Sequence, residues 1–508
     1  MRIKTIRSQT KHPSLREGLD GLFTLLLLLL VTACSGPQLP SQFSQVNSLP
    51  RIYPDYADVT IPVNIAPLCF ELFNEAEEAV TRFSCGSDEM IVEGTKIRPD
   101  IEAWRQLLEH ANGKDIAVEV FALNDGKWAR FKPFTLHVSP DSIDPWLSYR
   151  LISPSYVSYE ELTINQRCLE DFDERAIASN MLCSSEEKGQ CINCHSYQQY
   201  NPQRMQLHTR HAHGGTLISY DGKLSTLQLS SSNAPAVYPA WHPTQKLIAY
   251  SCNSTMQTFH TVDTDKIEVY DLQSSLSLYD IDSQQMTTIE ELPDEMATFP
   301  TWSPDGRYLY YSSAHFVYAA DTIDMEEITL RARELKYNIY RRSFDTTTHQ
   351  FGQRELIFAA DSLDMSATLP RISPDGRWLL FTMGEYGTFH IWHRDADLWM
   401  MDLNKKSERS EENARPLSEC NSVETESYHS WSSNGHWIVF SSRRHDGIFT
   451  RPYFAHIDEN GQGSKPFELP SADPDYHLQL LKSYNVPEFT KGPVTLTPQQ
   501  IAAELKKQ

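Results

Sequence analysis

The sequence is short of positive charge and of long apolar runs. It has 45 Lys and Arg residues against 67 Asp and Glu, which gives a formal net charge of −22 at pH 7. Such an excess of negative charge repels phosphate backbones, so we exclude a strongly basic binding protein and expect no nucleic acid partner. No stretch is apolar for 18 residues, the length that a membrane-spanning helix needs. No Gly-x-Ser-x-Gly elbow occurs, which leaves a serine hydrolase without support.

The N-terminus has the pattern of an export signal. Five basic residues lie within the first 16 positions, and an apolar run of 12 residues, Leu22–Ala33, follows. The run is too short to span a bilayer and suits a signal peptide. It ends in Val31-Thr-Ala-Cys34, and small residues before a cysteine resemble a bacterial lipoprotein box. The resemblance implies that residues 1–33 are a lipoprotein signal peptide and that Cys34 is lipidated. Signal cleavage with Cys34 as a bystander is the alternative.

These features predict a location as well as a modification. We expect a protein of the cell envelope, anchored to a membrane by its N-terminal lipid and facing the periplasm or the exterior. Residues 34–50 are rich in Ser, Pro and Gln and are predicted to form a flexible linker. Residues 51–150 alternate short β-rich runs with turn signals such as Asn124-Asp-Gly126. This alternation predicts a β-sandwich-like domain, interrupted by one helix near 101–112.

The next segment, residues 151–213, is predicted to be helical. Within Tyr159–Leu182, four apolar residues recur at offsets that share one helical face: Leu162, Leu169, Phe172 and Ala176. The acidic residues of the stretch lie largely elsewhere on the helix. We therefore expect a short helix that leads into the motif described below.

A repeat follows this segment. A turn and an apolar strand recur in four frames: Trp241–Tyr250, Trp302–Tyr311, Ile372–Phe381 and Trp431–Phe440. Ser303-Pro-Asp-Gly306 suits a type I turn, because proline fixes φ at the second position and glycine is favoured at the fourth. The strands after the turns are apolar enough to be buried on both faces, as in stacked sheets. The repeats resemble the Pro-Asp-Gly blades of TolB-like β-propellers. The resemblance implies a propeller of five or six blades over 214–490, followed by a tail over 491–508 that contains a short helix.

The chemistry of the sequence is concentrated in Cys191-Ile-Asn-Cys194-His195, which is the attachment pattern of c-type haem. Two cysteines at this spacing can add across the two vinyl groups of haem, and the following imidazole then binds the iron. We therefore predict one covalent haem c held by Cys191, Cys194 and His195. A structural zinc site would need a second pair of ligands at comparable spacing, and a redox dithiol would need a thioredoxin-like strand and helix around it. Both stay open as alternatives.

The second axial ligand of the iron is less closely defined. Met205 lies ten residues after His195 and is the first candidate, and His208 is the alternative. Methionine ligation would raise the reduction potential relative to two imidazoles. Met205 could instead only pack against the porphyrin, and the nearby histidines could be solvated or bind its propionates.

The remaining cysteines are expected to lie in an oxidising compartment, where disulfides can form. Apart from Cys34 and the motif, six are left, and the pairs Cys69 with Cys85 and Cys168 with Cys183 close the shortest loops. We expect these two local disulfides. For the last two, Cys252 and Cys420, free buried thiols are an equal alternative.

Taken together, the signal, the β-rich domain, the haem motif and the repeats resemble exported TolB-like propeller lipoproteins that carry one c-type haem. The expected fold is mainly β, with an N-terminal β-sandwich-like domain, a short helical haem c segment and a C-terminal TolB-like propeller. The resemblance implies a membrane-tethered, cytochrome-like carrier of single electrons, whose propeller docks a redox or envelope protein partner. The alternative is a propeller scaffold or binding protein with a structural haem or none. An electron carrier or interaction protein is expected rather than an enzyme, although an open haem face would permit peroxidase chemistry.

Overall fold

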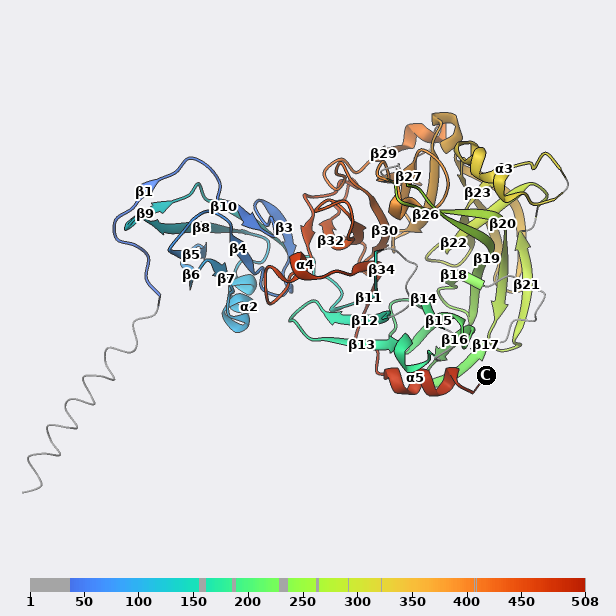
Figure 1. Cartoon of the computed structure of the whole chain (residues 1–508), viewed down its shortest axis with the longest axis horizontal. Coiled ribbons are helices and arrows are strands. Elements are labelled where there is room, and N and C mark those ends of the chain that lie inside the picture. Colours follow the sequence, from blue (N-terminus) through green and yellow to red (C-terminus); the bar gives the residue numbers. More distant parts are fainter. Residues whose placement is uncertain are drawn as a thin grey trace, which may run out of the picture.

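The computed structural model describes residues 37–154, 161–184, 189–227, 236–261, 265–290, 292–320, 322–405, 407 and 409–507. The chain is mainly β, as the sequence predicts, and consists of an N-terminal domain and a larger ring of sheets (Figure 1). The lipidation prediction at Cys34 and the signal peptide fall outside the described residues. Within the described residues, no helix has the length and apolar character needed to cross a membrane.

The N-terminal domain contains two sheets and one helix. The larger sheet has seven strands: β1 (Ser44–Gln45), β3 (Val59–Pro62), β5 (Glu78–Cys85), β6 (Asp88–Glu93), β8 (Asp115–Asn124), β9 (Lys127–Arg130) and β10 (Phe134–Ser139). The smaller sheet has three: β2 (Ile52–Tyr53), β4 (Phe70–Leu72) and β7 (Lys96–Ile97). The helix is α2 (Ile101–His110), which confirms the predicted helix. Its N-terminus is capped by the Asp100 side chain, and Trp104 of the helix is fully buried in the core of the domain.

The predicted linker is wrong in part. Residues Ser44–Gln45 form β1, which pairs in parallel with Ala129 and Arg130 of β9. The Phe43 ring packs edge-on against Phe121, and the Arg130 guanidinium lies 5.5 Å from the Phe43 ring centroid. The Ser and Gln residues of this stretch suggested a solvated spacer, but strand pairing with β9 and the Phe43 contact attach it to the sheet.

Six four-stranded sheets form the propeller. From the innermost strand outward, the blades are β34 (Ser483–Thr490), β11 (Trp146–Ile152), β12 (Thr163–Cys168) and β13 (Glu174–Ser179); β14 (Gln190–Tyr197), β15 (Arg204–His211), β16 (Gly215–Tyr220) and β17 (Lys223–Leu227); β18 (Ala236–Trp241), β19 (Leu247–Phe259), β20 (Ile267–Asp280) and β21 (Gln285–Glu290); β22 (Glu295–Trp302), β23 (Tyr308–His315), β24 (Asn338–Asp345) and β25 (Gln350–Phe358); β26 (Ser366–Ile372), β27 (Trp378–Gly384), β28 (Asp397–Asp402) and β29 (Ala414–Pro416); β30 (Glu426–Trp431), β31 (Trp437–Ser442), β32 (Arg451–His456) and β33 (Phe467–Glu468). We number these blades 1 to 6.

The ring closes through the C-terminal strand. Each innermost strand contacts the innermost strand of the next blade, in the order β34, β14, β18, β22, β26, β30 and back to β34. Because β34 completes the sheet begun by β11, blade 1 joins the two ends of the propeller. The propeller therefore begins near residue 146 rather than at 214, and the blade count is six. The segment just before the tail supplies the closing strand, β34.

The predicted helix over 159–182 is wrong, and with it the separate helical haem segment over 151–213. Residues 155–160 and 185–188 lie outside the described part. The described residues of the segment include the hairpin β12–β13 of blade 1 and the strands β14 and β15 of blade 2. The turn between the strands is an Asx turn, in which Asp171 Oδ1 accepts a hydrogen bond from the Asp173 amide. Leu162 and Leu169 flank the two ends of β12 and are both buried, Leu162 in the cluster between blades 1 and 2 and Leu169 in the core shared with the N-terminal domain. Their helical spacing therefore does not place them on one face of a helix.

The repeated frame forms the turn that its sequence predicts. The Gly306 amide donates to the Ser303 carbonyl, and the Ser303 hydroxyl donates to Asp305 Oδ1 at 2.6 Å. Gly306 has φ +70°, and a Cβ built there would lie 2.4 Å from the ring of His242. Glycine is therefore required here by both conformation and packing.

The remaining helices lie outside the sheets. They are α3 (Met325–Leu330), α4 (Tyr476–Gln479) and α5 (Pro498–Leu505), with 3₁₀ turns at Asn180–Leu182, Ala332–Glu334, Ala360–Leu363, His390–Trp392 and Ser410–Asn413. The predicted terminal helix is confirmed as α5. Ile501, Ala502 and Leu505 bury it against blades 1 and 2. The N-terminal domain is fastened to the propeller by a continuous core that includes Trp437 and Phe454 of blade 6.

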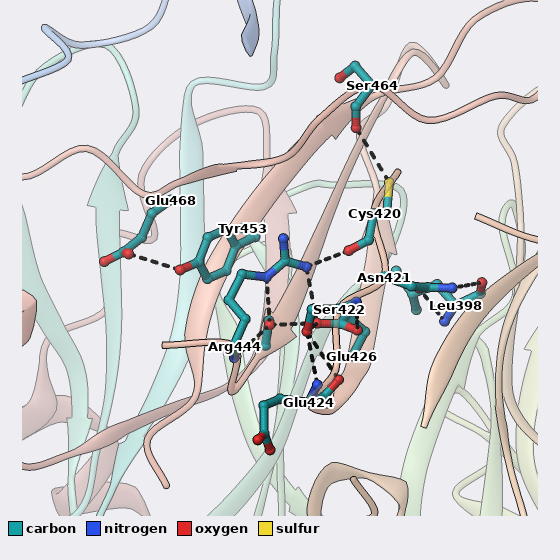
Figure 2. Close-up of polar contacts among 11 residues, drawn as sticks. Leu398, Cys420, Asn421, Ser422, Glu424, Glu426, Arg444, Tyr453, Ser464 and Glu468 are labelled. Atoms are coloured by element: carbon teal, nitrogen blue, oxygen red, sulfur yellow. Dashed lines mark hydrogen bonds and ion pairs between the residues drawn. The ribbon is translucent and has the colours of Figure 1, made fainter. Parts of the chain in front are cut away.

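All eight described cysteines are free thiols, so the two predicted disulfides are wrong. Cys183 packs in an apolar cluster with Ile152 and Leu162, whereas Cys168 lies opposite Trp146 across β11 and β12. Short loops therefore did not bring these sulfurs together. Cys420 belongs to a buried polar network of blade 6, in which its sulfur lies 3.7 Å from the Ser464 carbonyl oxygen (Figure 2).

Candidate ligand site in the propeller channel

The motif Cys191–His195 lies on β14, the innermost strand of blade 2. All three of its candidate ligands are buried, with 6% of Cys191, 7% of Cys194 and 1% of His195 exposed. A helical segment was expected to present them to a porphyrin. Instead, a strand at the centre of the ring presents them to the channel.

Cys194 occupies a position that recurs in every blade. Each innermost strand has a β-bulge in its pairing with the second strand, at which two of its residues stand opposite one residue of that strand. The residues at this point are all in the left-handed region, with φ between 43° and 54°: Cys194, Tyr238, Phe299, Leu369, Tyr428 and Val486. We call these six residues the channel ring. Bulky residues rarely adopt such φ values, so the backbone is strained at six equivalent points.

The channel ring surrounds a cavity of about 190 Å³. All six ring residues line it, together with Cys191, His195 and Phe389. The charged residues of the lining are Arg150, Arg210, Arg371 and Glu488. Three guanidinium groups against one carboxylate make this wall electropositive within a strongly acidic protein, which favours an anionic ligand.

One ion pair separates this cavity from a second cavity toward the Pro-Asp-Gly turns. Arg371 Nη2 lies 2.6 Å from Glu488 Oε1, and both residues line both cavities. Burial raises the pKa of Glu488, against the lowering effect of Arg371. The pair therefore partitions the channel and leaves Arg150 and Arg210 on the side of the motif.

A long hairpin covers the other mouth of the cavity. Strands β19 and β20 contain 13 and 14 residues, and their far ends supply Thr255, Gln257 and Val269 to the lining. Glu268 Oε2 lies 2.5 Å from His393 Nε2, and each side chain is 1% exposed. Blades 3 and 5 are not neighbours in the ring, so this contact reaches past blade 4.

His195 leans toward blade 1, and both of its ring nitrogens are buried. The backbone carbonyls of Ser148 and Val486 approach the ring and act to raise its pKa, although neither contact has full hydrogen-bond geometry. Burial lowers the pKa of His195 to about 3, so the imidazole is neutral at pH 7. A buried neutral imidazole with unpaired nitrogens has the donor chemistry of a metal ligand.

The two cysteines differ in backbone setting. Cys191 lies in regular pairing opposite Arg210 of β15, whereas Cys194 has φ 47°. Burial raises the pKa of the Cys191 thiol, while the nearby Arg150 and Arg210 lower it. Buried thiols of this kind are poor thiolate nucleophiles, which argues against a redox dithiol.

Neither predicted second axial ligand lies in the cavity lining. Met205 is fully buried in the apolar cluster between blades 1 and 2, with Ile192 and Leu207. His208 is 3% exposed, and its Nδ1 lies 3.0 Å from the Thr216 hydroxyl. Burial lowers the pKa of His208 to about 3. The structure thus brings together Cys191, Cys194 and His195, and leaves Met205 and His208 outside.

The residue types that haem c attachment requires lie at one cavity. Two thiols and a buried imidazole with unpaired nitrogens share one cavity, whose aromatic and aliphatic ring suits a planar apolar group and whose arginines suit carboxylates. The volume of about 190 Å³ is below the ~300–1,000 Å³ of sites that enclose a drug-sized ligand, so a porphyrin requires the lining to open.

Comparisons with known proteins add little beyond the fold. No family model and no curated protein matches the chain. Among solved structures, a puromycin hydrolase matches with a TM-score of 0.36 at 10% identity, over 64% of this chain and 45% of that one. The propeller domain of the trilobed protease from Pyrococcus furiosus matches with 0.32 at 10%, over 70% and 95%. A chain of a nidogen/laminin complex matches with 0.36 at 8%, over 67% and 97%. These scores are too low to carry an argument about function.

Sequence reasoning missed most of the cavity wall. The arginines Arg150, Arg210 and Arg371 come from three blades and have no shared motif. The sequence does contain a pattern that marks the channel ring. A Pro or His directly follows each ring residue, and an aromatic or Ile residue stands three positions after the ring residue, as in Phe299-Pro-Thr-Trp302 and Cys194-His-Ser-Tyr197. Extending the repeat toward the N-terminus would have placed Cys194 in the ring.

Proposed function

We propose that this protein is a binding propeller of the cell envelope and that its channel cavity is the ligand site. The observation that supports this most is the channel ring, in which six strained residues surround one cavity walled by three arginines. Strained backbone conformations of this kind are found preferentially at functional sites. The ligand class is a group with an apolar, planar body and an anionic edge.

The proposal includes haem c as the resident ligand. Cys191 and Cys194 would form the two thioethers, and His195 would bind the iron through a nitrogen that has no partner in the described structure. Arg150 and Arg210 would neutralise carboxylates. Haem supplies one-electron chemistry when bound. The channel ring and the far ends of β19 and β20 would surround the bound group.

A one-electron carrier is the second candidate function. The observation that favours it is that the structure gathers Cys191, Cys194 and His195 at a single cavity although the surrounding fold is a propeller. In this account a redox or envelope protein partner docks on the propeller, and lipid at Cys34 tethers the protein to the membrane. The formal charge of −22 favours a basic partner and disfavours nucleic acid.

The test is an optical spectrum of the full protein from a host that attaches haem to exported chains. We expect a reduced-minus-oxidised spectrum of c type that persists in denaturant, because the haem is covalent. Reversible one-electron reduction would support the carrier role. If no external donor can reduce the haem, its role is structural only. Protein without haem from such a host would contradict the haem proposal.

Separate variants test the binding role of the cavity. Replacing Arg210 by Gln removes a positive charge from the cavity wall. Because Arg210 lines the same cavity as the motif, this variant should shift the haem spectrum or the reduction potential of the haem. Lys246→Gln is the matched control, because Lys246 is exposed at a turn and pairs with Asp282. Equal spectra and potentials in both variants would contradict a role for the arginine wall.

A further inference from the structure

In the repeated frame, the last residue of the turn before the second strand of a blade is usually a basic residue. This position holds Lys246, Arg307 and Arg377 in blades 3, 4 and 5, and His436 in blade 6. In blade 5, Arg377 Nη2 lies 3.3 Å from Asp402 Oδ2 at the end of the third strand. The charges of such a pair attract, so this position ties two strands together.

Blade 6 replaces both members of this pair by histidine. Trp378 is opposite Asp402 in blade 5, and Trp437 is opposite His456 in blade 6. The two imidazoles of His436 and His456 are stacked, with ring centroids 6.1 Å apart and planes 10° apart. Two neutral imidazoles cannot form an ion pair with each other, so the substitution removes the interaction that blade 5 has.

A carboxylate from outside the blade meets the two imidazoles. Asp141 lies in the connector between β10 and β11, and its Oδ2 is 2.9 Å from His456 Nε2. Its Oδ1 is 3.9 Å from His436 Nε2. One ligand atom from each of the three residues lies within 4.8 Å of the others. The three side chains are 20% to 47% exposed, so the cluster is reachable from solvent.

We propose that Asp141, His436 and His456 bind a zinc ion. Two imidazole nitrogens and a carboxylate oxygen are a common three-ligand set for Zn²⁺, with bonds of ~2.0–2.2 Å and water in the fourth position. Ligand atoms around such an ion lie ~3.2–3.6 Å apart, so the observed spacings need only small side-chain movements.

The surroundings hold the carboxylate in place. Trp437 Nε1 donates to the Asp141 carbonyl oxygen at 3.0 Å, and the Ser139 hydroxyl donates to Asp141 Oδ2 at 3.2 Å. These two hydrogen bonds fix the position of Asp141, as outer contacts do for metal ligands.

The position gives the ion a structural role. Asp141 precedes β11, the first strand of blade 1 in the sequence, while His436 and His456 belong to blade 6. The ring closes within blade 1, where β34 pairs with β11, and blade 6 is the neighbour of blade 1 in the ring. Zinc would fasten the connector between the N-terminal domain and β11 to blade 6. This inference is independent of the channel cavity, whose lining contains none of the three residues.

The experiment is titration of the full-length protein with ZnCl₂ by calorimetry after chelator treatment. Cys191→Ser/Cys194→Ser is the parent, so that the motif thiols cannot bind the metal. We expect one Zn²⁺ per chain and a higher melting temperature with zinc. His436→Ala should weaken binding at least about tenfold, and Asp141→Asn should do the same while keeping the Trp437 hydrogen bond. His315→Ala is the matched control, because His315 faces one carboxylate, Glu295 at 3.6 Å, without a second imidazole.

Each outcome decides the proposal. Stoichiometric zinc that is lost in His436→Ala and Asp141→Asn and retained in His315→Ala supports it. No zinc in the parent, or equal affinity in all variants, overturns it. His436 is 47% exposed, so its variant is expected to fold, and circular dichroism of the metal-free proteins verifies this.

Discussion

Blades 2 and 6 carry the same pattern at the channel but differ in chemistry. In blade 2 the ring residue Cys194 is followed by His195, and in blade 6 Tyr428 is followed by His429. His429 Nε2 lies 3.3 Å from the Leu380 carbonyl of the preceding blade. The corresponding carbonyl of blade 1, that of Ser148, lies near His195. A histidine at this point is therefore explained by packing between blades.

The cysteines are not explained in this way. The other ring positions hold Tyr, Phe, Leu and Val, which fill the channel, whereas cysteine is the smallest ring side chain. Three residues before the ring, blade 2 has Cys191 where blade 6 has Thr425. The histidine alone is therefore weak support for a haem site, and the two cysteines are what distinguish blade 2 from the other blades.

Removing the cysteines should have the largest effect. In Cys191→Ser/Cys194→Ser, we expect complete loss of covalent haem with the propeller still folded, because serine keeps the size of the side chain. Intact mass and the optical spectrum measure this. Cys252→Ser, a cysteine of blade 3 outside the cavity lining, should keep its haem. Equal haem content in both variants would break the distinction between blade 2 and the other blades.

Acid should destabilise the haem-free protein through both histidines. Burial lowers the pKa of His195 and of His429 to about 3, below the ~6.5 of an unfolded histidine. The unfolded state therefore binds protons first, so stability is complete above pH 6.5 and is lost as the pH falls toward 3. Each histidine should cost about 2 kcal/mol between pH 6.5 and pH 5.

Urea denaturation at the two pH values measures this loss. His429→Asn should reduce the difference by about that amount, and His195→Asn should match it in the Cys191→Ser/Cys194→Ser background. His110→Asn, at an exposed site, should leave the difference unchanged. An unchanged pH dependence in both buried variants would show that the two imidazoles are not held neutral.

Alanine at the same two positions should separate packing from iron binding. Without haem, His195→Ala and His429→Ala should each lower the free energy of unfolding by about 1.5 kcal/mol, since both remove a buried ring. With haem, His195→Ala alone should change the Soret and α bands. A spectral change in His429→Ala of equal size would remove the special role of blade 2.

The smallest expected effect concerns backbone strain. At Cys194, with φ 47°, glycine should be more stable than alanine by about 1 kcal/mol, because alanine carries the left-handed penalty. At Cys191, in regular pairing, the order should reverse by about 0.5–1 kcal/mol. Thermal denaturation of the four haem-free variants measures both differences. The same order at both positions would contradict the strained ring.

Much of the fold could be predicted from the sequence because it is local. The Ser-Pro-Asp-Gly turns, the strands after them and the helices α2 and α5 follow from short patterns that the structure reproduces. The hairpin β12–β13 could not be predicted, because the seven-residue spacing of Leu162 and Leu169 matches two turns of a helix as well as the two ends of one six-residue strand. The closing strand β34 takes its place by pairing with β11, and local sequence does not report that pairing.

The candidate site divides in the same way. Cys191, Cys194 and His195 are adjacent in sequence and were found as a motif, and the structure brings them to one cavity. Met205 is close in sequence but lies on the second strand, where the pleat turns it into the core between blades. Arg150 and Arg371 come from distant blades, so only the ring brings them to the motif.

The most direct measurement is the mass of the tryptic peptide Gly189–Arg204 from protein purified from its native host. The account predicts a single species that carries one haem bonded to both Cys191 and Cys194. A peptide with both sulfurs unmodified, or joined to each other, would contradict it and leave the propeller with a cavity whose ligand is not haem.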